Sequence, residues 1–134
     1  MGREFIEAES YTEDNGTLYV FDEENLPFVV SRLFFVCAPK GATRGKHAHR
    51  SGRQFLTVVN GRINVSMRTL SGKSFNYQLN TGQGVYMPAL TWGVQEFVEQ
   101  GSVLLVLCDS RYNESDYIRD EREFLKMSRK GLSR

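Results

Sequence analysis

The sequence predicts an all-β domain, a sandwich or barrel of strands followed by one short helix. Apolar and β-branched runs recur at close spacing with turn signals between them, which is typical of sandwiches and barrels. Two runs, residues 63–67 and 75–79, alternate between apolar and polar residues, as strands with one buried face do. A chain of 134 residues with 40% hydrophobic residues has the size of one domain with its own core. We therefore expect residues 1–134 to form a single domain.

The N-terminal residues 1–22 are expected to carry two short strands. The turn between them is marked by Asn15-Gly16, a dipeptide that favours positive φ at both central residues. Pro27 then opens a branched and aromatic run over residues 28–38, which predicts a longer strand.

The barrel itself is expected within residues 27–110. Residues 55–59 form a short, nearly continuous apolar run ended by Asn60-Gly61, which predicts a buried strand and a tight turn. The alternating hairpin follows, and the region ends with a short strand at residues 85–88 and a second buried strand at residues 103–108.

The pattern changes period after the last strand. Four apolar residues fall on one face of a helix: Tyr117, Ile118, Phe124 and Leu125. Asn113, with Asp116 three residues later, has the spacing of a helix N-terminal cap. The sequence therefore predicts a helix over residues 113–127 that packs on the barrel.

Charge and composition narrow the classes of partner. Lys and Arg number 17 and Asp and Glu number 16, and a net charge of +1 gives no reason to expect nucleic acid or a membrane. The chain has no run of signal-peptide or membrane-spanning length, which predicts a cytoplasmic protein. Cys37 and Cys108 both lie in apolar runs and are expected to be reduced, buried thiols, with a disulfide as the alternative.

The two histidines of the chain, His47 and His49, are the main candidates for chemistry. If their segment is extended, the spacing of two residues directs both rings to the same face, because side chains alternate across a strand. An imidazole with a pKa near about 6.5 accepts and returns protons at neutral pH.

The residues around this pair resemble the two sequence motifs of the cupins. In the first motif the histidine pair is followed after four residues by Gln54 and after six more by Gly61, and in the second Gly82 is followed after five residues by Pro88. This resemblance implies a jelly-roll barrel.

The metal ligands of the cupins are not all present. A metal-binding cupin holds its ion with three histidines and a glutamate, and here Gln54 and Gly93 stand at two of those four positions. The two remaining histidines are too few for a tight transition-metal site, so we expect no metal and no other cofactor.

A closer resemblance covers nearly the whole chain. The sequence is similar to the sugar-nucleotide 3,4-ketoisomerases, small cupins that convert dTDP-4-oxo-6-deoxyglucose to its 3-oxo isomer on routes to amino sugars of bacterial surface glycans. The resemblance rests on five places: Arg32-Leu33-Phe34-Phe35, the run from Arg44 to His49, Gln54, the turn from Pro88 to Trp92, and the tail from Asp116 to Asp120.

The resemblance implies metal-free isomerisation of a dTDP-linked 4-oxo-6-deoxy sugar through an enediol. By position, His49 is expected to remove the proton at C3 and His47 to shuttle a proton near C4. Members of the family also use a tyrosine in the strand before the histidines. Here that strand has phenylalanine at both candidate positions, Phe34 and Phe35, and we take Phe35 as the place of the missing hydroxyl.

Four further residues are candidates for substrate binding. Arg32 and Arg44 have the forked donors that suit a pyrophosphate, or they are ordinary surface charges. Gln54 binds the sugar or satisfies a buried backbone group. Trp92 either stacks on the thymine or sugar at the mouth of the barrel or packs in the core.

The family resemblance also implies a homodimer, in which the N-terminal strands of residues 1–22 are exchanged between subunits. Two other functions stay open. One is a cupin sugar-nucleotide 3,5-epimerase, which uses a histidine base with an aspartate and a tyrosine at other spacings. The other is a cupin that binds a sugar nucleotide without chemistry, in which the histidine pair is structural.

Overall fold

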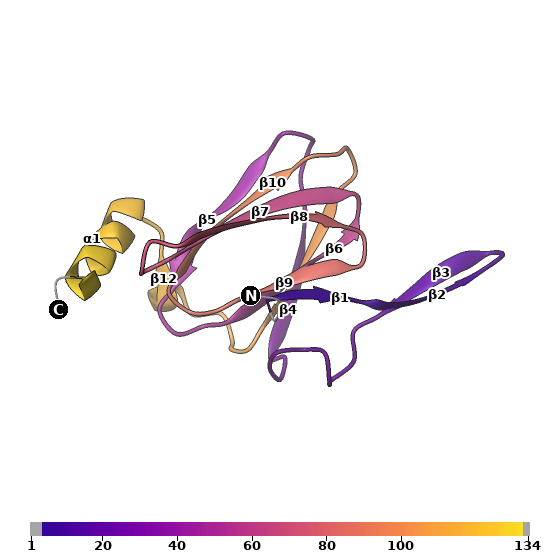
Figure 1. Cartoon of the computed structure of the whole chain (residues 1–134), viewed down its shortest axis with the longest axis horizontal. Coiled ribbons are helices and arrows are strands. Elements are labelled where there is room, and N and C mark those ends of the chain that lie inside the picture. Colours follow the sequence, from indigo (N-terminus) through magenta and orange to yellow (C-terminus); the bar gives the residue numbers. More distant parts are fainter. Residues whose placement is uncertain (1–3, 133–134) are drawn as a thin grey trace.

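Two five-stranded antiparallel sheets face each other in the computed structural model, which describes residues 4–132, with side chains as far as Ser128 (Figure 1). The first sheet has the order β1-β9-β6-β11-β4, and its strands are Phe5–Glu7, Gln83–Met87, Gln54–Asn60, Val103–Cys108 and Arg32–Cys37. The second has the order β12-β5-β10-β7-β8, and its strands are Tyr117–Ile118, Thr43–His49, Thr91–Phe97, Arg62–Thr69 and Ser74–Asn80. The prediction of an all-β fold is confirmed.

The core lies between the two sheets. In β7 the residues Ile63, Val65 and Met67 are buried and alternate with more exposed polar residues, as the period-two pattern predicted. They pack against Leu56 and Leu104 from the opposite sheet, within one cluster of buried apolar side chains.

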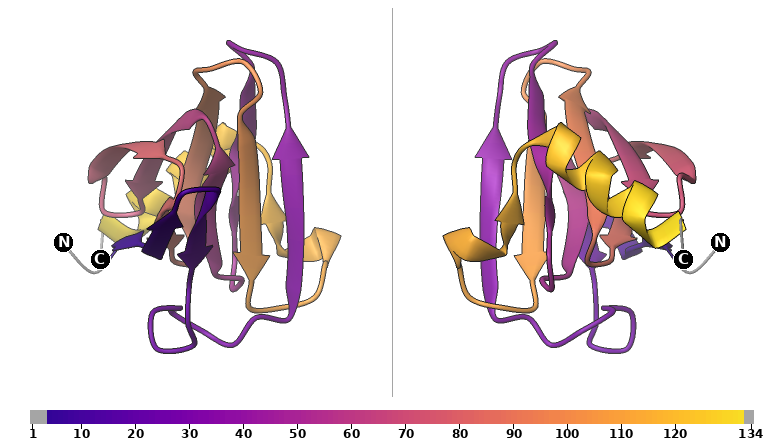
Figure 2. Two further views of the ribbon diagram at one scale, coloured as in Figure 1. Left: turned by 90° about the vertical axis from the view of Figure 1, so that its right-hand side faces the viewer. Right: turned by 90° about the vertical axis from the view of Figure 1, so that its left-hand side faces the viewer.

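A second, smaller cluster lies under the C-terminal helix α1 (Glu121–Leu132). It consists of Ala48, Trp92, Ile118 and Phe124. Figure 2 shows α1 crossing in front of the sheet that contains β5 and β10. The helix therefore covers the outward-facing Ala48 of β5 and Trp92 of β10 at one end of that sheet.

The C-terminal helix does not begin at residue 113, so this part of the prediction is wrong. Asn113 accepts a hydrogen bond from the Ser115 backbone N–H, but it caps only a single 3₁₀ turn, Glu114–Asp116. Tyr117 and Ile118 then pair with His49 and Ala48 as the edge strand β12. The helix begins at Glu121, where the Asp120 carboxylate accepts a hydrogen bond from the Arg122 backbone N–H, and it continues beyond residue 127 to Leu132.

The N-terminal hairpin is present, with a different turn. Strands β2 (Glu9–Glu13) and β3 (Gly16–Val20) pair with Glu13 opposite Gly16, so the two loop residues are Asp14 and Asn15. Neither loop residue has a positive φ. The hairpin extends away from the two sheets, whereas the short β1 before it pairs with β9 of its own chain (Figure 1).

Two strands differ from those predicted from the sequence. The strand predicted over residues 28–38 begins only at Arg32, and the strand β10 was not predicted. In β10 the outward-facing Trp92 packs under the helix, and the inward-facing Gly93 and Gln95 line the interior cavity, so apolar and polar residues do not alternate by face. In the described part of the chain, no helix has the length and apolar character needed to cross a membrane.

Candidate active site

A bulge in β5 brings the basic residues of this strand to the inside of the fold. The register between β5 and β10 shifts at Gly93 and Val94, and Gly45 and Lys46 both have positive φ, 86° and 60°. A Cβ on Gly45 would lie 2.6 Å from the Gln95 side-chain oxygen, so only glycine fits there.

The bulge sets which side chains face inward. Arg44 and His47 line an interior cavity, although their separation of three residues would put them on opposite faces of a regular strand. His49 follows His47 on the same face, whereas Lys46 and Ala48 face outward toward α1. The predicted pairing of the two histidines on one face is confirmed.

The cavity between the sheets has a volume of about 170 Å³. Its apolar wall includes Leu56, Met87 and Leu104. Its polar lining consists of Arg44, His47, Gln54, Gln95, Tyr117 and Arg119. A small neighbouring pocket of about 10 Å³ shares Gln54 and Tyr117 with it and is lined also by His49 and Arg32. The two histidines therefore line adjoining pockets that share two residues.

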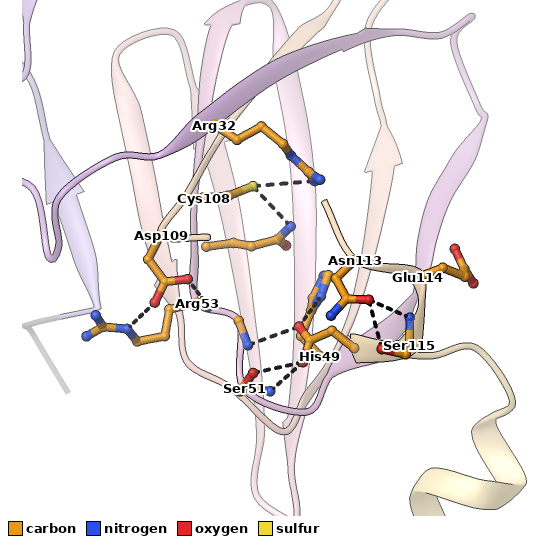
Figure 3. A network of polar contacts seen from close by, with 12 residues as sticks. Arg32, His49, Ser51, Arg53, Cys108, Asp109, Asn113, Glu114 and Ser115 are labelled. Atoms are coloured by element: carbon orange, nitrogen blue, oxygen red, sulfur yellow. Dashed lines mark hydrogen bonds and ion pairs between the residues drawn. The ribbon is translucent and has the colours of Figure 1, made fainter. Parts of the chain in front are cut away.

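His49 is held by a carboxylate in the orientation of a general base. Its Nδ1 lies 3.3 Å from Asp116 Oδ2, and because a carboxylate only accepts, Nδ1 carries the proton. The carboxylate of Asp116 is fixed by hydrogen bonds from the Ser51 backbone N–H and hydroxyl and from the Gly52 backbone N–H (Figure 3). His49 Nε2 is buried and has no hydrogen-bond partner among the described residues. Its lone pair is free to accept a proton.

His47 has the same protonation pattern with a different partner. Its Nδ1 donates to the Gly45 carbonyl at 3.1 Å, so Nε2 again has the free lone pair. The two imidazole rings are perpendicular, with centroids 5.0 Å apart.

Both histidines are neutral at pH 7. Burial, together with the charge of His49, lowers the pKa of His47 to about 4. Burial also lowers the pKa of His49, although the Asp116 carboxylate acts in the opposite direction. Burial raises the pKa of Asp116 itself, but the hydrogen bonds from Ser51 and Gly52 outweigh this and leave that pKa below its ordinary value.

Arg32, Gln54 and Cys108 meet beside His49. Arg32 Nη2 and Gln54 Nε2 each donate to the Cys108 sulfur at 3.7 Å (Figure 3). Neither Arg32 nor Arg44 pairs with a carboxylate in the part of the chain that the structure describes. Two uncompensated guanidinium groups therefore face the site, which suits an anionic ligand.

Trp92 does not line the cavity. It is buried on the outer face of β10, where its ring packs at 5.8 Å from that of Phe124. This position agrees with core packing, its other interpretation, and separates Trp92 from the interior cavity.

Phe35 also faces away from the cavity. In β4 alternate residues face outward, and Phe35 is 66% exposed on the outer surface. Phe34 is the residue that lines the cavity, with the Arg32 guanidinium 5.1 Å from its ring centroid. A hydroxyl on this strand would reach the site only from position 34, so the assignment to Phe35 is wrong.

Three residues of the site were not assigned a role from the sequence: Asp116, Tyr117 and Arg119. The Tyr117 ring centroid lies 4.3 Å from that of His49 and 5.0 Å from that of His47, and the Arg119 guanidinium stacks on it at 4.1 Å. The run from Asp116 to Arg119 was one of the marks of the family resemblance, and this was the signal that these residues belong to the site.

The residues present do not fit the metal site of a cupin. Within residues 4–132, no three His, Cys, Asp or Glu side chains converge as metal ligands. At the position of one expected histidine stands Gly93, where even a Cβ would lie 2.5 Å from the Met87 methyl carbon. Gln54, at the glutamate position, uses its amide to donate to Cys108.

Comparison with known proteins identifies the family. Residues 1–129 match the family model described as "FdtA: WxcM-like, C-terminal". This chain belongs to the FdtA family. A relative from Aneurinibacillus thermoaerophilus, a TDP-4-oxo-6-deoxy-α-D-glucose 3,4-oxoisomerase, is 28% identical over 94% of this chain and 92% of its own length. The family resemblance seen in the sequence is confirmed.

Solved structures of sugar 3,4-ketoisomerases share the fold. QdtA, a sugar 3,4-ketoisomerase from Thermoanaerobacterium thermosaccharolyticum solved with TDP, superimposes with a TM-score of 0.85 at 27% identity and covers 95% of this chain and 94% of its own. A histidine-to-asparagine mutant of QdtA was solved with TDP-4-keto-6-deoxyglucose. A 3,4-ketoisomerase from Helicobacter canadensis also has a TM-score of 0.85, at 26% identity over 94% of this chain and 96% of its own. The prediction of a cupin jelly roll is confirmed.

Proposed function

We propose that this chain is a 3,4-ketoisomerase that converts a TDP-linked 4-oxo-6-deoxy sugar to its 3-oxo isomer. The observation that carries the proposal is a pair of neutral histidines on one face of β5, each with Nε2 free. Moving a carbonyl by one carbon requires proton transfer at two neighbouring carbons, and two such bases beside one cavity meet this requirement. The oxoisomerase activity and the ligands of the relatives support the same substrate class.

The reaction begins at C3. His49 Nε2 takes the C3 proton, and the resulting imidazolium is stabilised by the Asp116 carboxylate on its other side. His47, 5.0 Å away ring to ring, relays this proton to C4 of the enediol. With transfer of the C3 hydroxyl proton to the C4 oxygen, the carbonyl moves from C4 to C3 with no net gain or loss of protons or electrons.

The nucleotide part of the substrate is bound through its charge. Arg44 lines the cavity and Arg32 lines the pocket beside His49, and neither guanidinium is neutralised by a carboxylate among the described residues. We assign the diphosphate to Arg44 and the sugar oxygens to Arg32 and Gln54. A diphosphate accepts the forked donors of arginine in pairs.

The test is incubation with TDP-4-oxo-6-deoxyglucose in deuterated water. Because the proton held by the histidines exchanges with solvent before it is delivered, we expect a 3-oxo product with deuterium at C4 and deuterium at C3 of recovered substrate. We expect no loss of rate after treatment with a chelator. Label at C5 indicates a 3,5-epimerase, and binding without label indicates a binding protein. Either result, or a rate restored only by added metal, contradicts the proposal.

We also propose that the enzyme is a homodimer. The edge strand β4 exposes Leu33 at 59% and Phe35 at 66%, and Val59 on β6 is 51% exposed on the same sheet. An uncovered apolar edge strand is an aggregation hazard unless a partner covers it. The protruding β2–β3 hairpin, with Tyr11 and Leu18 exposed, is long enough to contact a second copy.

Light scattering at micromolar concentration tests the dimer. We expect twice the chain mass for the wild type and a single chain mass for Phe35→Asp, because burying a carboxylate in an apolar interface is costly. The exposed and distant Lys73→Asp is the matched control and should remain dimeric. A wild type with the mass of one chain contradicts the dimer.

We further propose a cytoplasmic location. Cys37 is exposed and Cys108 is buried, so the prediction that both are buried is wrong for Cys37, which lies on the outward face of β4. Both thiols are free. An exposed free thiol is typical of proteins that work in a reducing compartment.

A further inference from the structure

The two histidines leave the site with two bases and no acid. Each imidazole directs its only proton into the protein, His47 to the Gly45 carbonyl and His49 to the Asp116 carboxylate. Neither Nε2 has a proton to give, because both rings are neutral at pH 7. As the C3 proton leaves, however, negative charge develops on the C4 oxygen, and enolisation is slow unless this oxygen is protonated at the same time.

Tyr117 is the one residue lining the interior cavity that carries a hydroxyl, counted over the described part of the chain. The guanidinium groups of Arg44 and Arg119, which also line the cavity, hold their protons too tightly to release them near neutral pH. The remaining polar lining is made of the amides Gln54 and Gln95. A proton donor for a sugar oxygen therefore has to be the phenol of Tyr117.

The position of Tyr117 suits this task. In the pairing of β12 with β5 it lies directly opposite His49, and its ring contacts both imidazoles, at 4.3 and 5.0 Å between centroids. It lines both the cavity and the small pocket beside His49. A sugar carbon within reach of His49 thus places its oxygen within reach of the same tyrosine.

Two guanidinium groups lie beside Tyr117. The Arg119 guanidinium stacks on its ring at 4.1 Å. The pKa of Arg32 lies above its ordinary value. Burial alone would lower this pKa, but the nearby Tyr117 hydroxyl and Cys108 thiol raise it by more. Of these two cations, Arg32 has no carboxylate partner among the described residues, whereas Arg119 also pairs with Glu114.

We propose that Tyr117 is a further catalytic residue, the acid and base that serves the two sugar oxygens while the histidines serve the two carbons. In the first half-reaction His49 accepts the C3 proton and the Tyr117 hydroxyl gives its proton to the C4 oxygen, forming the enediol. In the second half-reaction the Tyr117 phenolate takes the proton of the C3 hydroxyl as C4 receives the proton returned from the histidines. The carbonyl is now at C3, and every group of the enzyme has recovered its starting proton.

The inference rests on the proposed ketoisomerase activity and explains how the site works without a hydroxyl on β4. Phe34 occupies the inward position of that strand, so the missing hydroxyl is supplied from the facing edge strand β12. Tyr117 and Phe34 lie on different sheets and line the same cavity.

The test compares Tyr117→Phe with Tyr112→Phe. Tyr112 is the matched control, because its ring packs 5.7 Å from that of Tyr117 but its hydroxyl donates to Glu114 and it is 59% exposed. We expect Tyr117→Phe to lower kcat by about 10²–10³-fold with TDP affinity unchanged, and Tyr112→Phe to stay within a few-fold of the wild type. A Tyr117→Phe variant that retains wild-type kcat, or equal losses in the two variants, overturns the inference.

A second measurement does not depend on how the variant folds. Replacement of Tyr117 by difluorotyrosine keeps the ring and its contacts but makes the phenol more acidic. If Tyr117 must be protonated at the start of the reaction, the alkaline limb of the kcat profile moves to lower pH, and an unmoved limb contradicts the role. Wild-type protein without isomerase activity is a different outcome, since it refutes the ketoisomerase proposal itself.

Discussion

His49→Asn is expected to abolish turnover, with a loss of about 10³–10⁴-fold in kcat and little change in the affinity for TDP. Asparagine is the informative replacement, because its amide nitrogen lies close to the place of Nδ1 and can still donate to Asp116. The change therefore removes Nε2, the atom that takes the C3 proton, and leaves the surrounding hydrogen bonds. Isomerisation rate and solvent deuterium exchange at C3 should disappear together.

His47→Asn is the matched control, since the same amide nitrogen can replace Nδ1 in the hydrogen bond to the Gly45 carbonyl. If His47 only relays the proton to C4, this variant loses product formation but still exchanges the C3 proton with solvent. The opposite result, exchange lost in His47→Asn and retained in His49→Asn, reverses the two roles.

Most of the barrel could be predicted from the sequence, because local physics determines it. In both strands of the β7–β8 hairpin, apolar and polar residues alternate, as expected of strands with one buried face. Strands β6 and β11 are apolar runs of strand length. The two histidines could be paired on one face for the same reason. These inferences needed no knowledge of which segments meet in space.

The parts that failed depend on contacts between distant segments. Tyr117 and Ile118 have helical spacing with Phe124, yet they form a strand because the open edge of β5 offers them backbone partners. Trp92 follows a turn at the barrel end, but its ring packs against Phe124 of α1. Which of Phe34 and Phe35 points inward depends on the phase of β4, and both residues are apolar, so the pattern could not decide it.

The role of Asp116 depends on such a contact as well. Sixty-seven residues separate it from His49, and its neighbours in the sequence gave it the spacing of a helix cap. In the structure its two oxygens accept from Ser51 on one side and from His49 and Gly52 on the other. All of these partners are donors, and a carboxylate, which only accepts hydrogen bonds, can satisfy all of them.

Asp116→Asn is expected to lower kcat by about 10²–10⁴-fold, although the side chain does not touch the substrate. An asparagine has one acceptor oxygen and one donor nitrogen in place of the two oxygens. If the nitrogen faces His49, it donates to Nδ1 and forces the proton onto Nε2, where the ring can no longer act as a base. If it faces Ser51 instead, it opposes the backbone N–H that now bonds Oδ1 and loosens the loop that carries the carboxylate.

The pH profile separates this positioning role from a purely structural one. A base acts when deprotonated, and burial already places the pKa of His49 below 6.5, so the wild-type kcat/KM should fall only as the pH drops beneath that value. The Asp116 charge raises this pKa, so its removal must move the acid limb of Asp116→Asn to still lower pH. Asp109→Asn is the matched control, because its carboxylate is equally enclosed, 15% exposed against 14%, and also holds a loop through a backbone N–H. If Asp116→Asn loses kcat while the acid limb of its pH profile stays in place, Asp116 supports the fold and does not tune the pKa of His49. The same conclusion follows if Asp109→Asn shows an equal shift of the acid limb.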